Sequence, residues 1–227
     1  MAELIVALDL PSGDEAVQLL DRLPAARWVK VGSVLFTREG PALIEELVQE
    51  RGLHVFLDLK WHDIPNTVAG AVEAAAGLGV ALATVHALGG EPMMRAAVDA
   101  ARGRLRLVGV TVLTSHDAPS LQAVMGREVG NLGLEVSRLT RLAAHSGLDG
   151  VVCSPHEVER VRQLLGPDPW IVVPGIRRPE DAAGDQRRTA GPAEAVRAGA
   201  THLVVGRPLV QASDPAAVFT ELMEAMA

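Results

Sequence analysis

The sequence predicts a single (β/α)8 barrel of the TIM type that spans residues 1–227. Short apolar runs alternate with longer helical segments eight times along the chain. Most of the short runs are almost continuously apolar, as expected for parallel strands that are covered on both faces. The length of the chain suits eight such units, and no linker or low-complexity segment divides them.

The expected strands are the short apolar runs, at residues 4–8, 28–31, 54–59, 83–86, 105–113, 150–154, 170–174 and 202–205. The expected helices are the longer segments between and after them, at residues 14–23, 41–51, 65–78, 91–102, 135–145, 156–165, 192–198 and 215–226. An open doubly wound sheet is the alternative arrangement, but no GxGxxG motif follows the first strand. This absence favours the barrel.

The overall charge argues against nucleic-acid binding. The chain has 21 basic and 28 acidic residues, which gives a formal net charge of −7. A protein that binds a duplex needs a basic surface to neutralise phosphates. Aromatic residues make up only 3% of the chain, so platforms on which bases could stack are scarce as well.

Nothing in the sequence predicts a membrane segment or a disulfide. The longest uncharged run, at residues 74–90, is interrupted by Gly77, Gly79 and His86, so it is typical of a helix, a turn and a strand. The N-terminal apolar run has no basic flank and soon reaches Asp9, so we expect no signal peptide and a cytoplasmic location. Cys153 is the one cysteine and is expected to be a small buried apolar side chain.

Lysine is rare in this chain. Of the 21 basic residues only Lys30 and Lys60 are lysines, and the others are arginines. Where arginine is so strongly preferred, a position that keeps lysine indicates a need for a compact ammonium group or for a proton that can leave.

Polar residues follow the expected strands at the end where barrels carry their active sites. Asp58 and Lys60 are two residues apart on one strand, so their side chains face the same side, toward the barrel mouth. Lys30 on the neighbouring strand is expected beside Asp58, and Asp63 beside Lys60. Such an alternating array would hold Lys60 as an oriented proton donor. A purely structural ion-pair cluster is the alternative interpretation.

The second half of the chain predicts a phosphate site. Loops after the seventh and eighth strands of a barrel often bind phosphate, and here they carry Arg177, Gln186, Gly206 and Arg207. The long polar segment at residues 175–191 is expected to form a lid over this site. Three further arginines of this segment are expected to be solvated: Arg178, Arg187 and Arg188.

Residues 58–67, DLKWHDIPNT, resemble the DxKxxDIPNT signature of the orotidine 5'-phosphate decarboxylase family. Related barrel enzymes share DxKxxD, so the specific part of the resemblance is DIPNT together with the later segments. The resemblance extends to Ala7-Leu8-Asp9, Lys30-Val31-Gly32, Leu113-Thr114-Ser115, Pro174-Gly175-Ile176-Arg177, Gln186 and Val205-Gly206-Arg207-Pro208.

The resemblance implies a carboxy-lyase that converts orotidine 5'-phosphate to UMP and CO2, the last step of pyrimidine nucleotide synthesis, without a metal or organic cofactor. It implies that Lys60 protonates C6, with Asp58 near the substrate carboxylate and Lys30 and Asp63 completing the array. It also implies a homodimer, in which Asp63 and Thr67 reach the site of the partner subunit.

The resemblance assigns the remaining contacts to the substrate as well. Asp9 and Lys30 would contact the ribose, and Thr114 the pyrimidine. The phosphate would be held by Arg177, Gln186, Gly206 and Arg207. Ile64 and Pro174 are also expected among the substrate-binding residues.

Two alternatives stay open. One is a metal-dependent sugar-phosphate decarboxylase or aldolase of the same barrel group, although Lys30 on the second strand is unfavourable for Mg²⁺. The other is a barrel that binds a ribonucleotide phosphate without catalysis, although such a protein needs no lysine–aspartate array. The seven histidines show no metal-ligand spacing, so we predict no metal site.

Overall fold

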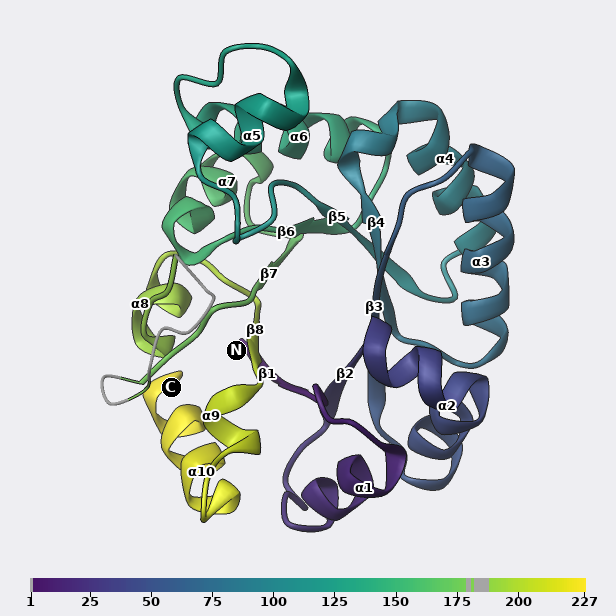
Figure 1. Cartoon of the computed structure of the whole chain (residues 1–227), viewed down its shortest axis with the longest axis vertical. Coiled ribbons are helices and arrows are strands. Elements are labelled where there is room, and N and C mark those ends of the chain that lie inside the picture. The colour runs from purple at the N-terminus through teal and green to yellow at the C-terminus, as the bar shows by residue number, and fades with distance from the viewer. Residues whose placement is uncertain (1, 179–180, 182–187) are drawn as a thin grey trace.

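The computed structural model describes residues 2–178, 181 and 188–227. In it, parallel strands close into a barrel in the order β1 to β8, with β1 paired to β8 (Figure 1). The predicted (β/α)8 barrel is confirmed. The strands are β1 (Glu3–Ala7), β2 (Trp28–Gly32), β3 (His54–Trp61), β4 (Leu82–His86), β5 (Arg106–Val110), β6 (Gly150–Val152), β7 (Trp170–Val173) and β8 (His202–Val205).

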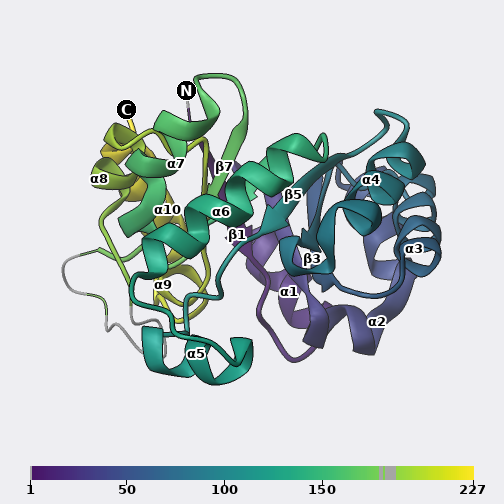
Figure 2. The ribbon, with the colours of Figure 1, turned by 90° about the horizontal axis from the view of Figure 1, so that it is seen from above.

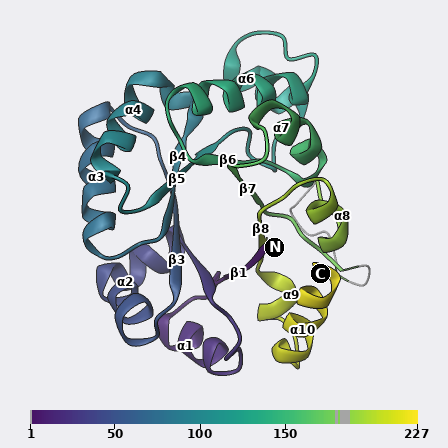
Figure 3. The same ribbon diagram turned by 180° about the vertical axis from the view of Figure 1, so that it is seen from behind.

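Helices surround the barrel on its outer face (Figures 1 and 3). None of the helices in the described part of the chain is long and apolar enough to cross a membrane. The helices are α1 (Gly13–Asp21), α2 (Ser33–Glu45), α3 (Pro65–Gly77), α4 (Gly90–Ala101), α5 (Ala118–Met125), α6 (Leu132–His145), α7 (Val158–Leu165), α8 (Pro192–Arg197), α9 (Arg207–Val210) and α10 (Pro215–Ala225). Three short helical segments join them: a π-helical turn at Glu46–Glu50 and 3-10 turns at Ala87–Gly89 and Pro155–Glu157.

Four elements differ from the prediction. An additional helical part, beginning at Ser33, precedes the helix expected to begin at residue 41; α2 is broken at Gly40, where a φ of 64° suits glycine, and its second part starts at Pro41 as predicted. The expected strand at 105–113 ends at Val110, which leaves the residues after it free to form a loop. Helices α5 and α9 were not predicted, and Figure 2 shows α5 at the end of the barrel away from both chain termini.

Buried side chains form two clusters because successive strand residues face opposite sides of the barrel wall. Along β1, Leu4 and Val6 belong to the large cluster between the wall and the helices, whereas Ile5 and Ala7 belong to the smaller one. Cys153 is 1% exposed, which confirms it as a buried residue, and burial raises the pKa of its thiol. The thiol therefore stays protonated and unreactive at neutral pH.

Aromatic and imidazole rings pack together near the N-terminal ends of the strands. Trp28 contacts His202 and Trp170 with ring centroids 5.3 and 5.9 Å apart, and Trp170 lies 4.3 Å from His202. His202 begins β8 and is 5% exposed. This burial lowers the pKa of its imidazole from 6.5 to about 4.

We expect acidification to destabilise the fold through His202. The imidazole takes up a proton near pH 6.5 in the unfolded chain but only near pH 4 in the folded one. The free energy of unfolding therefore falls as the pH drops from about 6.5 to 4, by about 3 kcal/mol at most from this residue. Urea denaturation at pH 7 and pH 4.5 should show a smaller loss in His202→Phe than in the wild type. An equal loss in both proteins would contradict the assignment.

Candidate active site

A cavity of about 550 Å³ opens at the C-terminal ends of the strands. Its size is typical of a pocket for a small molecule. Polar and charged groups form part of its wall, and they are Asp9, Lys30, Asp58, Lys60, Thr114, Arg177 and Arg207. Apolar side chains form another part, and they include Val110, Val112, Val152, Val172 and Val204.

Two lysines and two aspartates meet at this cavity. Lys60 Nζ lies 2.9 Å from both carboxylate oxygens of Asp58. Lys30 Nζ lies 2.8 Å from Asp9 Oδ1 and 4.0 Å from Asp58 Oδ2. The contiguous set Asp9–Lys30–Asp58–Lys60 is called the charged array below. It contains three of the four residues that the sequence predicted to form an alternating array.

Burial makes this array more than a set of solvated charges. The side chains of Lys30 and Asp58 are only 11% and 15% exposed, whereas that of Lys60 is 40% exposed toward the cavity. A carboxylate in such surroundings is stable only when it is paired, and here each charge has an opposite charge beside it. Lys60 is thereby held in place while its ammonium group stays accessible.

Two glycines make room for the array. A Cβ atom on Gly32 would lie 3.2 Å from Lys30 Nζ, and one on Gly206 would lie 3.4 Å from Asp9 Oδ2. The distance at Gly32 is tighter than an ordinary van der Waals contact, so a larger residue there would displace the Lys30 ammonium group, and a Cβ on Gly206 would also lie 3.3 Å from Ala7 Cβ. Gly206 also leaves its backbone open toward the cavity, where Arg207 begins α9.

The backbone of Lys60 is in the left-handed region, with a φ of 53°. For a residue with a Cβ this conformation costs on the order of 1–3 kcal/mol, and such residues are concentrated at functional sites. The β3–β4 register shifts at this point, which is a feature that simple strand alternation does not predict. Sequence analysis also missed Thr84, a buried threonine in an apolar strand whose hydroxyl contacts this segment.

Asp63 is separated from the array within one chain. Its carboxylate accepts a hydrogen bond of 2.6 Å from the N–H of Ile64, and no contact joins it to Lys60 among the residues that the structure describes. The expected Asp63–Lys60 contact is therefore not made by a single chain. Asp63, Ile64 and Thr67 are all exposed, with Ile64 66% exposed, and none of them lines the cavity of its own chain.

A second hollow of about 520 Å³ also borders the array. It shares the four charged residues of the array with the main cavity and extends toward the start of α2. Its outer wall includes Pro11, Val34 and Arg38. The array thus borders two hollows.

The predicted phosphate residues lie together where the structure describes them. Arg177, Gly206 and Arg207 line the cavity with Pro174. The N–H of Arg177 donates to Ala190 O at 3.0 Å, which closes the base of the segment expected to be a lid. Gln186 and the rest of residues 179–180 and 182–187, about half of that segment, lie outside the described residues.

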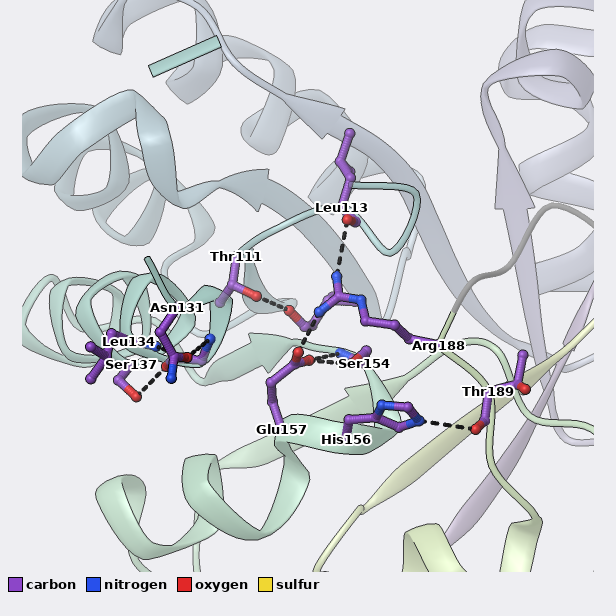
Figure 4. A network of polar contacts seen from close by, with 12 residues as sticks. Thr111, Leu113, Asn131, Leu134, Ser137, Ser154, His156, Glu157, Arg188 and Thr189 are labelled. Carbon is purple, nitrogen blue, oxygen red and sulfur yellow. Dashed lines mark hydrogen bonds and ion pairs between the residues drawn. The ribbon is translucent and has the colours of Figure 1, made fainter. Parts of the chain in front are cut away.

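Two of the arginines expected to be solvated are instead largely buried. Arg178 is 15% exposed in its side chain and pairs with Asp181 and Glu221. Arg188 is 11% exposed, is paired with Glu157, and donates at 3.1 Å to Leu113 O (Figure 4). The prediction was wrong because buried guanidinium groups need carboxylate partners, and two of these partners are distant in the sequence: Glu221 for Arg178 and Glu157 for Arg188. Arg187 lies outside the described residues.

The Arg188 ion pair braces the wall of the cavity. Glu157 Oε2 also accepts a hydrogen bond of 2.9 Å from the N–H of Ser154, and Ser154 follows the cavity residue Cys153 (Figure 4). Leu113 precedes Thr114, and both line the cavity. One buried ion pair therefore connects the loops after β5, β6 and β7.

Histidine provides no metal site in the described part of the chain. No group of three or more His, Cys, Asp or Glu side chains there is arranged to hold a metal ion. His62 and His86 stack with ring centroids 5.2 Å apart. Burial, with the nearby His62 and Lys60, lowers the pKa of His86 to about 4, so its ring is neutral at pH 7.

Residues 2–222 match the sequence model of a family described as Orotidine 5'-phosphate decarboxylase / HUMPS family. The chain belongs to this family. The resemblance identified from the sequence is therefore confirmed, and the family accounts for almost the whole described barrel.

Curated members of the decarboxylase family are similar over nearly their full length. The orotidine 5'-phosphate decarboxylase of Halorhodospira halophila is 53% identical, over 94% of this chain and 91% of the relative. That of Chromohalobacter salexigens is 51% identical, over 99% and 95%. The crystal structure of orotidine 5'-phosphate decarboxylase from Lactobacillus acidophilus has a TM-score of 0.89 and 37% identity, and the match covers 100% of this chain and 99% of that one.

Proposed function

We propose that the protein decarboxylates orotidine 5'-phosphate to UMP and CO2, the last step of de novo pyrimidine nucleotide synthesis. The observation that carries the proposal is the placement of a Lys60–Asp58 pair and of Arg177 and Arg207 in one cavity. The pair supplies a proton donor, and the arginines supply a grip for a phosphate. The names of the relatives support this choice among the reactions of the family.

The chemistry explains why Lys60 is a lysine. When the bond between C6 and the carboxylate breaks, its electron pair stays on C6, and the ring delocalises this charge poorly. The ammonium group of Lys60 stabilises the developing charge and then transfers a proton to C6, which leaves a neutral amine for solvent to reprotonate. A guanidinium group keeps its proton in proteins, so arginine could supply the charge but not the proton.

The other members of the array have distinct proposed roles. Asp58 lies near the departing carboxylate and fixes Lys60 through the two 2.9 Å contacts. Asp9 and Lys30, joined at 2.8 Å, bind the ribose hydroxyls. The pyrimidine lies against the apolar wall near Thr114 and Pro174. In this proposal the reaction uses no metal or organic cofactor, because Lys60 itself supplies the cation and the proton.

We also propose a homodimer in which the partner subunit's Asp63 and Thr67 complete each site. The hollow beside the array is open to an incoming segment, and Asp63, Ile64 and Thr67 are exposed on their own chain. Exposed apolar side chains at Val34 and Ile64, each 66% exposed, suit contact with a second copy. The proposal also treats residues 1–227 as a single functional domain. It places the protein in the cytoplasm, where a step of nucleotide synthesis is expected.

The absorbance of orotidine 5'-phosphate after addition of the protein and EDTA tests the proposed reaction. Loss of the orotate chromophore, with UMP as the product, is the expected result. Turnover that EDTA abolishes would favour a metal-dependent enzyme of the same family. Binding of UMP without any turnover would leave a nucleotide-binding barrel and overturn the proposal.

Replacement of Arg207 by alanine is expected to raise the KM for orotidine 5'-phosphate by about 10- to 100-fold, because charge-assisted hydrogen bonds to the phosphate are lost. Isothermal titration should show the same loss for UMP but not for uridine, which has no phosphate. Arg197→Ala, on the exposed face of α8, is the matched control. Equal weakening of UMP and uridine would show that Arg207 does not bind the phosphate.

A further inference from the structure

Thr84 is a polar residue in the middle of an apolar strand. It lies in β4 between Ala83 and Val85, and all three residues are 0% exposed. A hydroxyl group that is fully removed from water is costly unless it finds hydrogen-bond partners inside the protein. The partners of Thr84 therefore indicate why this position is not valine.

Both partners of the Thr84 hydroxyl are in β3. The N–H of Lys60 donates to Thr84 Oγ1 at 2.8 Å, and Thr84 Oγ1 lies 3.1 Å from Asp58 Oδ1. An amide can only donate and a carboxylate can only accept, so the single proton of the hydroxyl points toward Asp58. The hydroxyl thus connects the backbone of Lys60 with the side chain of Asp58.

This connection replaces a missing part of the β-sheet. β3 advances from Leu57 to Trp61 while β4 advances only from Ala83 to Val85, so the ladder is interrupted opposite Thr84. Within the interruption Lys60 has its left-handed φ of 53°. The Thr84 hydroxyl accepts the hydrogen bond that a strand carbonyl would accept in a regular ladder.

The contacts form a closed ring. The N–H of Lys60 donates a hydrogen bond to the Thr84 hydroxyl, and this hydroxyl donates one to the Asp58 carboxylate. The same carboxylate accepts a hydrogen bond of 2.9 Å from Lys60 Nζ. The two ends of Lys60 are therefore fixed relative to each other through one hydroxyl group. Loss of that group would release the backbone of Lys60 and let the Asp58 carboxylate turn toward Lys30, which is now 4.0 Å away.

We infer that Thr84 is a positioning residue for the reaction: its hydroxyl holds Lys60 in the left-handed conformation and aims both Lys60 and Asp58 into the cavity. This inference rests on the proposed function. Thr84 does not line the cavity, so it acts through Lys60 and Asp58 and not on the substrate. Its hydroxyl makes no hydrogen bond to the described residues that are proposed to bind the phosphate or the ribose.

Thr84→Val removes the hydroxyl and keeps the branched shape, so it isolates the proposed role. We expect kcat to fall about 10- to 100-fold, since a small displacement of a reacting group has an effect of this size. The KM and the Kd for UMP should stay within about threefold, because the groups that bind the phosphate and ribose are unchanged. Thr84→Ser keeps the hydroxyl and should recover most of the lost kcat.

Thr111→Val is the matched control. Thr111 is also 0% exposed, and its hydroxyl donates to Val152 O at 2.8 Å, but it has no contact with the array. We expect this variant to keep the wild-type kcat even if its thermal unfolding temperature falls as much as that of Thr84→Val. The comparison separates the loss of a buried hydrogen bond from the loss of orientation.

Several results would overturn the inference. They are a wild-type kcat in Thr84→Val, an equal defect in Thr84→Ser, and an equal fall of kcat in Thr111→Val. A wild-type protein without decarboxylase activity would instead refute the proposed function, so the two failures are distinguishable. A crystal structure of Thr84→Val gives a readout apart from activity, since Lys60 should leave the left-handed region or Asp58 should turn toward Lys30.

Discussion

Replacement of Lys60 by alanine is expected to lower kcat for decarboxylation by about four orders of magnitude or more, while UMP still binds. Two contributions are lost together. Proton transfer from a positioned group contributes about 10²- to 10⁴-fold, and a preorganised charge at the reacting atom contributes about 10²- to 10³-fold. Binding should persist because the cavity residues proposed to contact other parts of the nucleotide, which are the arginines and Asp9, are unchanged.

Lys60→Arg separates the two contributions. It keeps a positive charge beside Asp58 but cannot release a proton, so its kcat should stay far below that of the wild type. Product formation should be followed by absorbance, and the Kd for UMP by titration calorimetry. A wild-type kcat in Lys60→Arg would show that the proton comes from elsewhere. A wild-type kcat in Lys60→Ala would refute the proposed role of Lys60 altogether.

The barrel could be predicted because the sequence features that indicate its strands are local. A strand covered on both faces needs apolar side chains at consecutive positions, and such runs are visible in the sequence. Strand alternation also placed Asp58 and Lys60 on one side of β3, and the two 2.9 Å contacts confirm that placement. The parallel order of the strands then brought Lys30 to the same end of the barrel.

Features that depend on distant partners could not be predicted in this way. Lys60 has its left-handed backbone because β3 and β4 lose register, which depends on two strands at once. Arg188 is buried because Glu157 is beside it, 31 residues earlier in the chain. The sequence signal for the first feature is a polar residue in an apolar strand, Thr84 in β4, whereas Arg188 stands in a polar segment that gives no sign of its burial.

Helix α5 was missed although its start has a local signal. Asp117 accepts a hydrogen bond from the N–H of Ser120, and Ser120 Oγ accepts one from the N–H of Asp117, which is a reciprocal capping arrangement. Pro119 lies in the first turn, where proline is favoured. The residues at the start of α5 therefore carry a sufficient local signal for a helix N-terminus.

Asp63 is the opposite case. Its place in the motif predicts a position beside Lys60, but within a single chain it lies apart from the charged array. It is exposed and makes no contact with Lys60. If the partner subunit's Asp63 completes the site, then Asp63→Ala should lower kcat by about 10²- to 10³-fold, as for loss of other preorganised charges. The substitution in one subunit should impair the site that contains Lys60 of the partner subunit.

Mixing two inactive variants tests this directly. When Lys60→Ala and Asp63→Ala subunits exchange at random, half of the dimers are mixed, and each mixed dimer has one site with both native residues, so about a quarter of the wild-type activity should return. Lys60→Ala mixed with Asp58→Ala is the control, because both defects affect the same chain's array and no intact site forms. Absence of recovery after subunit exchange has been verified by native mass spectrometry would place Asp63 outside the partner's site. Recovery in the first mixture alone would show that the exposed carboxylate of one chain completes the charged array of the other.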